Sequence, residues 1–478
     1  MEELIVKFAS ILWGPPTMVL IFGVGILFSI KTRFFQIRKL GYILDNTLFA
    51  IFRKSDKKDD SEGTMTAFQA VATALSGTVG NANMAGVATA IVIGGPGSVF
   101  WMWLVALFGM ITKLVEVSLA VHYREKDADG NFYGGPMYYI EKGLGDSWKP
   151  LAKFFALMMV IGGLGTAVFV QPHTMSMAMK NIFSIPPYVT IIASVVVAGM
   201  VILGGFKRIG VFCEKITPAM CGFYVLGAIG ILIVNIQNLP EAFRLIFVHA
   251  FQPMSAFGGF AGSTVVLAIQ RGVSRGVFSN EAGMGSAPIV HATAKTDHPI
   301  RQGMFGSFEV FVDTIIVCTM TALVILSSGP EIWGSGLNGI DLTMAAFENV
   351  YGIFGKGMIE ICVLLFAFST MVGWEIEFET SFIYIFGEKT KMFARILYLI
   401  PPFLTLGKTT EMIWTIVDIA VGIVVLPNII ALLMLSKVFV ELMNDFEKNK
   451  MEPELLKNAI KNRIYLEIDK FLFISYFK

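Results

Sequence analysis

The chain has 478 residues, of which 55% are hydrophobic and 15% are charged, with a formal net charge of +1. Soluble domains carry about 25% charged residues, so this composition and a mean hydropathy of +0.68 indicate a protein that crosses a membrane several times. The near-neutral charge gives no basis for nucleic-acid binding. The first apolar run lacks the flanks of a signal peptide, so we do not expect one.

Cysteine and histidine residues do not indicate a metal or redox site. The four cysteines lie in or beside apolar segments without a CxxC pattern, which is typical of buried residues. The five histidines are scattered, without the close spacing of metal ligands. No nucleophile–base pair stands out in the apolar segments. We therefore expect no enzyme activity and no organic cofactor.

Eleven apolar runs are long enough to cross a bilayer at about 20 residues per crossing. The tenth is short and contains Pro401-Pro402, so it is predicted to be tilted or re-entrant. The sequence thus predicts an all-α integral membrane protein with 11 transmembrane helices. In chain order the runs are residues 14–31, 66–94, 98–122, 151–180, 187–205, 212–235, 258–287, 306–328, 357–386, 392–407 and 411–437.

Basic residues alternate between the connections and predict the orientation. Eight of them follow the first run, against Lys7 alone before it. Others recur at 124–149, 207–215 and 389–395, whereas 329–356 is mainly acidic. Because cytoplasmic loops are enriched in Lys and Arg, we expect the N-terminus outside and the C-terminus cytoplasmic. The expected location is the plasma (inner) membrane of a prokaryote.

The second to sixth runs and the seventh to eleventh form two sets of five. Since five is odd, the second set enters the membrane from the opposite side, as in an inverted-topology repeat. A stretch at 34–53 mixes aromatic and basic residues at helical spacing and predicts an interfacial helix. The predicted units are residues 1–63 (N-terminal and interfacial helices), 64–235 (first repeat), 236–257 (external loop), 258–437 (second repeat) and 438–478 (cytoplasmic tail).

Two glycine-rich interruptions open the two sets. They read SGTVGNANMAG at 76–86 and RGVFSNEAGMG at 275–285, the second with its break between Ala268 and Gly285. Glycine is disfavoured in a helix interior, and backbone groups freed in lipid need partners. Paired breaks in two halves are therefore typical of a transporter's binding site. For the first interruption, the alternative is that its glycines only permit close helix packing.

The first interruption combines several groups suited to an amino acid. The amides of Val79 and Gly80 would face a new helix N-terminus and suit a carboxylate. Carbonyls near Gly77 would suit a cation or an ammonium group. In the second interruption, Phe278 could close over a substrate. Glu281 could line the path, or instead pair with Arg271 or Arg275.

Further polar residues lie inside the runs. Gln171, next to Pro172, is expected to donate hydrogen bonds into a pocket. Ser369 and Thr370 suit an alkali cation, or they bond to the preceding turn of their own helix. Lys113 and Glu116, three apart on one helix, are expected to pair, whereas Asp313 has no partner that the sequence identifies.

The chain resembles the alanine/glycine:cation symporters over residues 14–437. The resemblance rests on GTVGNANMAGVATAIVIGGPGSVFWMW, YGGPMYYIEKGLG, GGFKRIG, GGFAGSTVVLAI, RGVFSNEAGMGSAPIVHATAKTDHPIRQG and LPNIIALL. It implies the leucine-transporter-like fold of the amino acid–polyamine–cation superfamily: a ten-helix 5+5 inverted-repeat core, the first helix of each repeat discontinuous, plus one extra N-terminal helix. It also implies sodium- or proton-coupled uptake of alanine and glycine.

The resemblance also implies site residues. A sodium ion would lie between the carbonyls of Ala74 and Gly77 and the hydroxyls of Ser369 and Thr370. The substrate would be bound by residues of both interruptions together with helices four and nine: Thr78, Val79, Gly80, Asn81, Asn83, Gln171, Gly272, Gly276, Phe278, Ser279, Asn280, Thr370 and Trp374.

The chain departs from this family after Trp374. Where a Tyr-rich stretch ending in Gly-Glu is usual, it reads Glu375-Ile376-Glu377-Phe378-Glu379, and only Glu379 fits. In addition, Gln270-Arg271 stands where an Arg followed by an aromatic residue is commoner. These changes leave open the local structure of the ninth run and the transport activity of the protein.

The predicted function is secondary active transport: symport of the small neutral amino acids alanine and glycine with a cation, most simply sodium, by alternating access. A proton-coupled symporter of the same fold is one alternative. Another is a channel, which would need a ring of carbonyls or charges around a pore. The expected partners are the amino acid, sodium and membrane lipid, without nucleic acid. A monomer suffices, and the oligomeric state stays open.

Overall fold

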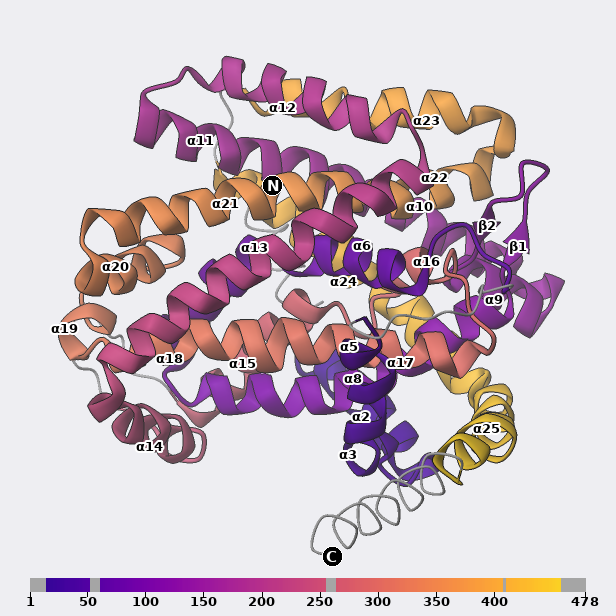
Figure 1. Cartoon of the computed structure of the whole chain (residues 1–478), viewed down its shortest axis with the longest axis horizontal. Helices are drawn as coiled ribbons and strands as arrows, with labels where there is room; N and C mark the ends of the chain where they lie inside the picture. Colours follow the sequence, from indigo (N-terminus) through magenta and orange to yellow (C-terminus); the bar gives the residue numbers. More distant parts are fainter. Residues whose placement is uncertain (1–13, 52–60, 255–263, 407–409, 457–478) are drawn as a thin grey trace, which may run out of the picture.

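The computed structural model describes residues 14–51, 61–254, 264–406 and 410–456, without the side chains of 15, 51, 181–182 and 410–421. Predictions that concern 1–13, 52–60, 255–263, 407–409 and the tail from 457 lie outside the described residues. In the described part, helices dominate, and one short hairpin pairs Glu125–Lys126 (β1) antiparallel with Phe132–Tyr133 (β2) (Figure 1). An all-helical membrane architecture is what the apolar runs predict.

The first half of the chain follows the predicted runs closely. The run predicted at 98–122 is helix α8, with the same bounds. The helices of this half are α2 (Pro15–Lys31), α3 (Phe35–Arg38), α4 (Leu40–Asn46), α5 (Leu48–Ile51), α6 (Ala67–Thr78), η1 (Ala82–Gly86), α7 (Val87–Gly94), α8 (Ser98–His122), α9 (Pro136–Leu144), η2 (Asp146–Trp148), α10 (Lys149–Gly165), η3 (Thr166–Val170), α11 (Gln171–Phe183), α12 (Pro187–Ile202) and α13 (Phe206–Val234).

The second half is more fragmented. The eighth run is one continuous helix that changes from α-helical to π-helical and back, as α17, η5 and α18. The ninth run consists of two successive α-helices, α21 and α22. The helices are η4 (Ile236–Asn238), α14 (Leu239–His249), α15 (Val265–Asn280), α16 (Ala287–His291), α17 (Pro299–Val310), η5 (Phe311–Cys318), α18 (Thr319–Ser327), α19 (Pro330–Trp333), α20 (Ile340–Tyr351), α21 (Ile353–Gly373), α22 (Glu375–Phe386), η6 (Glu388–Thr390), α23 (Lys391–Tyr398), η7 (Pro401–Thr405), α24 (Thr410–Met434), α25 (Ser436–Phe446) and η8 (Glu447–Met451).

Five described helices are long and apolar enough to cross a membrane in one piece, and a sixth span is possible if a pair bent by 62° at residue 435 counts as one. Other predicted runs are shorter apolar helices, such as Pro187–Ile202. The count of eleven and the inverted repeat therefore stay predictions. The helix expected at 34–53 is broken into α3, α4 and α5, because Lys39 and Thr47 leave the helical conformation.

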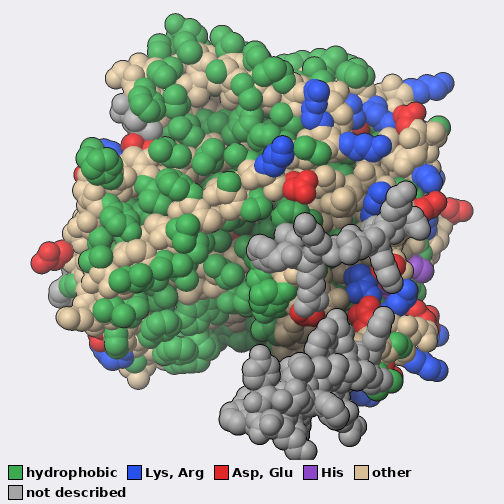
Figure 2. Space-filling model, viewed as in Figure 1, with side chains coloured by type: hydrophobic (Ala, Val, Ile, Leu, Met, Phe, Trp, Pro, Cys, Tyr) green, Lys and Arg blue, Asp and Glu red, His purple; other side chains and the backbone are tan. Residues whose placement is uncertain are grey.

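The surface divides into an apolar part and a charged end. Hydrophobic side chains cover the left and upper parts of the face in Figure 2, whereas charged side chains gather at the right. That end, here called the charged end, carries β1, β2, α9 and α25, and the acidic segment with α19 and α20 lies opposite (Figure 1). The basic connections meet there: Lys391 contacts Asp127 at 3.0 Å. Which side faces the cytoplasm stays a prediction.

Helix α8 packs against α15 and α17 and also contacts α2 and α16. Residues 109–121 of α8 are all buried and include Lys113 and Glu116. Burial of charged side chains is expensive unless they have partners. The interior around α8 is therefore where functional polar contacts should be sought.

Candidate functional site

The first predicted interruption is present. Helix α6 ends at Thr78, Val79 is extended with φ −76° and ψ 99°, and helical structure resumes at Asn81. Its amides do not face a ligand as expected: Val79 N–H donates to the carbonyl of Leu75 at 2.8 Å, and Gly80 N–H donates to Asn83 Oδ1 at 2.8 Å. The expectation of free amides is wrong because Asn83 caps the second half-helix from within.

The second interruption lies at the C-terminal end of its predicted window. Helix α15 is continuous to Asn280, and the break covers 281–286 before α16 begins. Glu281, Gly283 and Gly285 all have positive φ (55°, 91° and 81°). Glycine reaches this region without steric cost, so the two glycines permit the reversal and Glu281 is held there by its surroundings.

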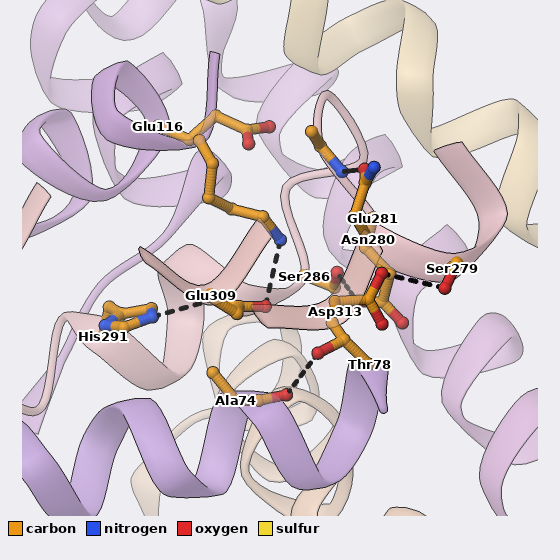
Figure 3. Close-up of polar contacts among 12 residues, drawn as sticks. Ala74, Thr78, Glu116, Ser279, Asn280, Glu281, Ser286, His291, Glu309 and Asp313 are labelled. Atoms are coloured by element: carbon orange, nitrogen blue, oxygen red, sulfur yellow. Dashed lines mark hydrogen bonds and ion pairs between the residues drawn. The ribbon is translucent and has the colours of Figure 1, made fainter. Parts of the chain in front are cut away.

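One carboxylate joins the two interruptions. Asp313, on η5, accepts a hydrogen bond from Asn83 Nδ2 at 2.6 Å and another from Ser279 Oγ at 2.8 Å. Thr314 donates a third at 2.7 Å. Figure 3 shows Asp313 beside Ser279 and Asn280. The sequence identified no partner for Asp313 because two of its three donors, Ser279 and Asn83, lie 34 and 230 residues away.

A cavity opens between the first interruption, η3, the second interruption and the end of α21. Seven of the predicted substrate residues line it: Thr78, Gly80, Asn81, Gln171, Phe278, Thr370 and Trp374. Gly77, from the predicted sodium set, lines it too. The remaining lining residues are Ala82, Thr166, Val170, Glu281 and Met284.

Three buried polar atoms around this cavity have no hydrogen-bond partner among the described residues: Asn81 Oδ1, Thr166 Oγ1 and Trp374 Nε1. Asn81 is fixed by its other end, since Nδ2 donates to Gln171 Oε1 at 3.3 Å. An unpaired buried polar group costs about 1–3 kcal/mol. The unpaired acceptors are Asn81 Oδ1 and the Thr166 hydroxyl, and the unpaired donors are Trp374 Nε1 and the same hydroxyl. With the Glu281 carboxylate, these groups are therefore left for a small polar ligand.

The glycines of the first interruption let the end of α21 approach closely. A Cβ added to Gly77 would lie 3.1 Å from Trp374 Cδ1, and one added to Gly80 would lie 3.3 Å from Thr370 Oγ1. Both contacts are tighter than ordinary van der Waals distance. Thus Gly77 and Gly80 bring Trp374 and Thr370 to the cavity.

The other predicted substrate residues lie behind the lining. Val79 is buried in the core, and Asn83, Ser279 and Asn280 are occupied by polar contacts, the last with Thr314 at 3.1 Å. Gly272 and Gly276 face α8: a Cβ on them would lie 2.2 Å from the Ser98 carbonyl and 2.5 Å from Val105. They permit close packing of α15 on α8 and do not line the cavity.

Thr166, Val170, Ala82 and Met284 were missed by the sequence reasoning. Thr166 and Val170 belong to η3, a π-helical turn between α10 and α11. Such turns often mark functional sites. A signal was present, since Gly162, Gly163 and Gly165 precede this turn and Pro172 follows it.

The predicted sodium residues are only partly assembled. Thr370 Oγ1 donates to the carbonyl of Ser76 at 3.0 Å, one residue from Gly77. Ser369 Oγ donates to Phe366 at 3.0 Å within its own helix, as the alternative expected. The Ala74 carbonyl accepts from Thr78 (Figure 3).

A buried ionic cluster lies next to the second interruption. Lys113 Nζ is 3.3 Å from Glu309, and His291 Nε2 is 3.0 Å from the same carboxylate (Figure 3). The expected Lys113–Glu116 pair is wrong, because tertiary packing offers Lys113 a residue from α17. Glu116 instead accepts from Asn428 Nδ2 at 2.5 Å and from Gly283 N–H at 3.2 Å.

Glu281 also finds a partner other than those expected. Its carboxylate accepts a hydrogen bond from Ser286, five residues on, across the same break. The Arg275 guanidinium lies 5.9 Å from the Phe278 ring instead. Glu116 and Glu281 together stabilise the irregular backbone at 281–286.

The fold is shared with known membrane transporters. A manganese transporter of Eremococcus coleocola superposes with a TM-score of 0.51 at 11% identity, covering 85% of this chain and 96% of that chain. This similarity concerns the fold alone.

Sequence relatives are much closer. The sodium/alanine symporter AgcS of Methanococcus maripaludis is 40% identical over 457 residues, covering 95% of this chain and 97% of that protein. A transporter of Haemophilus influenzae named as uncharacterized is 42% identical over 450 residues, with 93% and 96% coverage. The probable sodium/glutamine symporter GlnT of Bacillus subtilis is 35% identical, with 96% and 94% coverage.

The model of the sodium:alanine symporter family matches residues 1–459. The resemblance drawn from the interruptions and the other motifs is thereby confirmed. The chain belongs to the sodium:alanine symporter family of sodium-coupled amino acid transporters.

Proposed function

We propose that this protein carries alanine and glycine into the cell together with sodium. The observation that carries the proposal is the set of unpartnered atoms in one cavity: Asn81 Oδ1, Thr166 Oγ1 and Trp374 Nε1. A zwitterion supplies both an acceptor for the indole N–H and the hydroxyl, and donors for the amide oxygen and Glu281. The name of AgcS, a sodium/alanine symporter, supports alanine as a substrate.

The walls of the cavity favour a small side chain. The cavity is enclosed by the large side chains of Phe278, Val170, Met284 and Trp374. Trp374 is only 1% exposed. A pocket bounded by rings admits hydrogen or methyl at little cost, whereas larger side chains meet steric overlap. Glycine, whose side chain is a hydrogen atom, therefore belongs to the proposed substrate range together with alanine.

The coupling needs no covalent chemistry. Sodium would bind near the carbonyl end of α6, where Thr370 already contacts the carbonyl of Ser76 at 3.0 Å. An ion that stabilises the broken helix also stabilises the substrate site, so each ligand raises the affinity for the other. Alternating access would arise from movement of units 64–235 and 258–437 as inverted repeats, with the charged end cytoplasmic in a prokaryotic plasma membrane.

Uptake into proteoliposomes tests the proposal. We expect saturable uptake of labelled alanine and glycine that requires an inward sodium gradient and does not require a proton gradient. Leucine should compete weakly. Saturable uptake without sodium would contradict sodium coupling, and flux that does not saturate would indicate a channel.

A further inference from the structure

The charged end contains a second cavity, which shares no lining residue with the cavity between the two interruptions. It has a volume of about 570 Å³. Its walls come from the hairpin β1–β2, from α9 and η2, and from the end of α22 with the turn that follows it (Figure 1). The hairpin, α9 and η2 belong to unit 64–235, whereas α22 belongs to unit 258–437. A molecule in this cavity would therefore contact both units.

Negative charge dominates the walls of this second cavity. The lining has five carboxylates and two lysine ammonium groups, which leaves an excess of three negative charges. Both lysines are already paired, Lys142 with Glu125 and Lys126 with Glu62. A cleft lined mainly by one sign of charge attracts ions of the opposite sign. The five carboxylates are those of Glu125, Asp127, Glu141, Asp146 and Glu388.

Two of these carboxylates are available to a ligand. The other three have a lysine partner, in the pairs Glu125–Lys142 at 2.8 Å, Asp127–Lys391 at 3.0 Å and Glu141–Lys149 at 2.5 Å. Asp146 and Glu388 form no ion pair with any residue that the structure describes. Asp146 lies on η2 and Glu388 on η6, so each unit contributes one unpaired carboxylate.

A buried tyrosine hydroxyl faces the same space. Tyr138 of α9 is only 7% exposed, yet its hydroxyl has no hydrogen-bond partner in the described part of the chain. Burial, with the negative charge of Glu125 as the next cause, raises the pKa of Tyr138 well above its usual value, so the hydroxyl stays protonated. Glu388 and Glu141 act on it in the same direction, which places the hydroxyl among the acids of the cavity. Because buried polar groups are normally hydrogen-bonded, this hydroxyl indicates a ligand.

Aromatic rings add a further attraction for a cation. The rings of Tyr138 and Tyr384 pack edge to face with their centroids 5.3 Å apart, and Tyr133 lines the cavity beside them. The faces of such rings attract ammonium groups. Lys391 already uses this attraction, since its Nζ lies 5.7 Å from the centroid of the Tyr133 ring.

The arrangement suits an organic cation better than a metal ion. Among the described residues, no three His, Cys, Asp or Glu side chains lie close enough together to hold a metal. Hard metal cations need several oxygen ligands around one point. A volume of about 570 Å³ instead has the size of a site for a small organic molecule. Two unpaired carboxylates and apolar ring faces match a chain that carries an ammonium group at each end.

We propose that this second cavity binds an organic dication. One ammonium group would donate to Asp146 and the other to Glu388, and the Tyr138 oxygen would accept a further hydrogen bond from an ammonium group. The methylene chain between the ammonium groups would lie against the tyrosine rings.

The bound dication would also link the two units. Direct links are already present, because the Tyr384 hydroxyl donates to Glu141 and Lys391 contacts Asp127 at 3.0 Å. A dication held by both units strengthens this closed arrangement and slows any movement that opens the charged end. This slowing of transport rests on the proposed symport, whereas binding itself does not.

Calorimetric titration of the purified full-length protein in detergent tests binding. Putrescine, a diamine, should bind, and butylamine, with one ammonium group, should bind at least about tenfold more weakly. The double variant Asp146→Asn/Glu388→Gln should weaken putrescine binding at least about tenfold, and Tyr138→Phe about threefold. Because neither carboxylate has an ion pair to lose, the double variant should keep the thermal unfolding temperature of the wild type.

Asp341→Asn is the matched control for this titration, because it removes an exposed carboxylate on α20, opposite the charged end. It should bind putrescine like the wild type. Equal affinity for the two amines, or unchanged affinity in the double variant, would overturn the proposed site. Displacement of putrescine by Mg²⁺ in the wild type but not in the double variant would overturn the choice of an organic cation.

Alanine uptake tests the effect on transport. With putrescine on both sides of the liposome membrane, sodium-driven uptake should fall at least about threefold in the wild type and stay unchanged in the double variant. Binding without any effect on uptake would overturn the link between the units. Binding by a protein that takes up no alanine would refute the proposed symport and leave the site supported. Uptake by a protein that does not bind putrescine would refute the site alone.

Discussion

The two helix interruptions solve the same backbone problem with different side chains. In the first, Asn83 caps the backbone at Gly80 and Thr370 contacts Ser76, both uncharged. In the second, the carboxylates of Glu116 and Glu281 support residues 281–286. The first interruption thus keeps unpaired neutral groups toward the cavity, and the second is fixed by charge. The difference indicates one break supported mainly by neutral groups and one supported by carboxylates, joined by Asp313.

The largest effect should come from the ionic cluster behind the second interruption. Lys113→Met would leave Glu309 buried with His291 as its remaining described side-chain partner, and breaking a buried ion pair costs about 3–5 kcal/mol. We expect a strongly lowered thermal unfolding temperature in detergent. The double variant Lys113→Met/Glu309→Gln should recover most of the loss. If the double variant is no better than the single one, the pair is not what stabilises this region.

The link between the interruptions should matter next. Asp313→Ala removes the acceptor for Asn83, Ser279 and Thr314. With two breaks no longer held together, alanine uptake should fall about 100-fold, equivalent to about 3 kcal/mol.

Asp313→Asn should lie between Asp313→Ala and the wild type, since it keeps one acceptor oxygen. Uptake rates normalised to protein in the liposomes would measure both variants. Full activity of Asp313→Ala would show that the two interruptions work independently.

A smaller effect should follow from a change in the cavity wall beside the first interruption. Trp374→Phe keeps the ring that walls the cavity but removes its unpaired N–H. Loss of one hydrogen bond to a charged ligand costs about 1.5–3 kcal/mol, so the KM for alanine should rise at least about tenfold with little change in stability. Trp103→Phe is the matched control, because its N–H donates to Thr319 at 2.8 Å. An unchanged KM would remove Trp374 from the substrate contacts.

The smallest effect should appear at the charged end, away from both interruptions. Burial raises the pKa of Asp127, but hydrogen bonds from Asn131 and Lys391 outweigh it, so the pKa lies below the usual value. A lowered pKa contributes stability above the unfolded-state value and loses it as the pH falls through the folded-state value.

Asp127→Asn should therefore lower the free energy of unfolding by less than about 1 kcal/mol at pH 7. This difference from the wild type should shrink below about pH 4. Thermal unfolding at several pH values measures it. A difference that grows in acid would contradict the lowered pKa of Asp127.

Much of the local structure could be predicted from the sequence. Apolar length alone predicted the run at 98–122 with the bounds of α8 and the run at 14–31 to within one residue of α2. Glycine content located both interruptions, since a helix interior disfavours this residue. Side-chain pairing was harder, because Lys113 meets Glu309 across 196 residues rather than Glu116 across one turn.

Hydropathy, glycine spacing and charge asymmetry are properties of neighbouring residues. The sequence by itself therefore determined that this is a helical membrane protein with two broken helices, and it showed the resemblance to a known family. Tertiary structure alone decided which polar atoms are left unpaired. Asn81, Thr166 and Trp374 come from three segments, and only packing brings them to one cavity while turning Gly272 and Gly276 toward α8. The physical reason is that hydrogen-bond satisfaction depends on distances between helices, which no local pattern encodes.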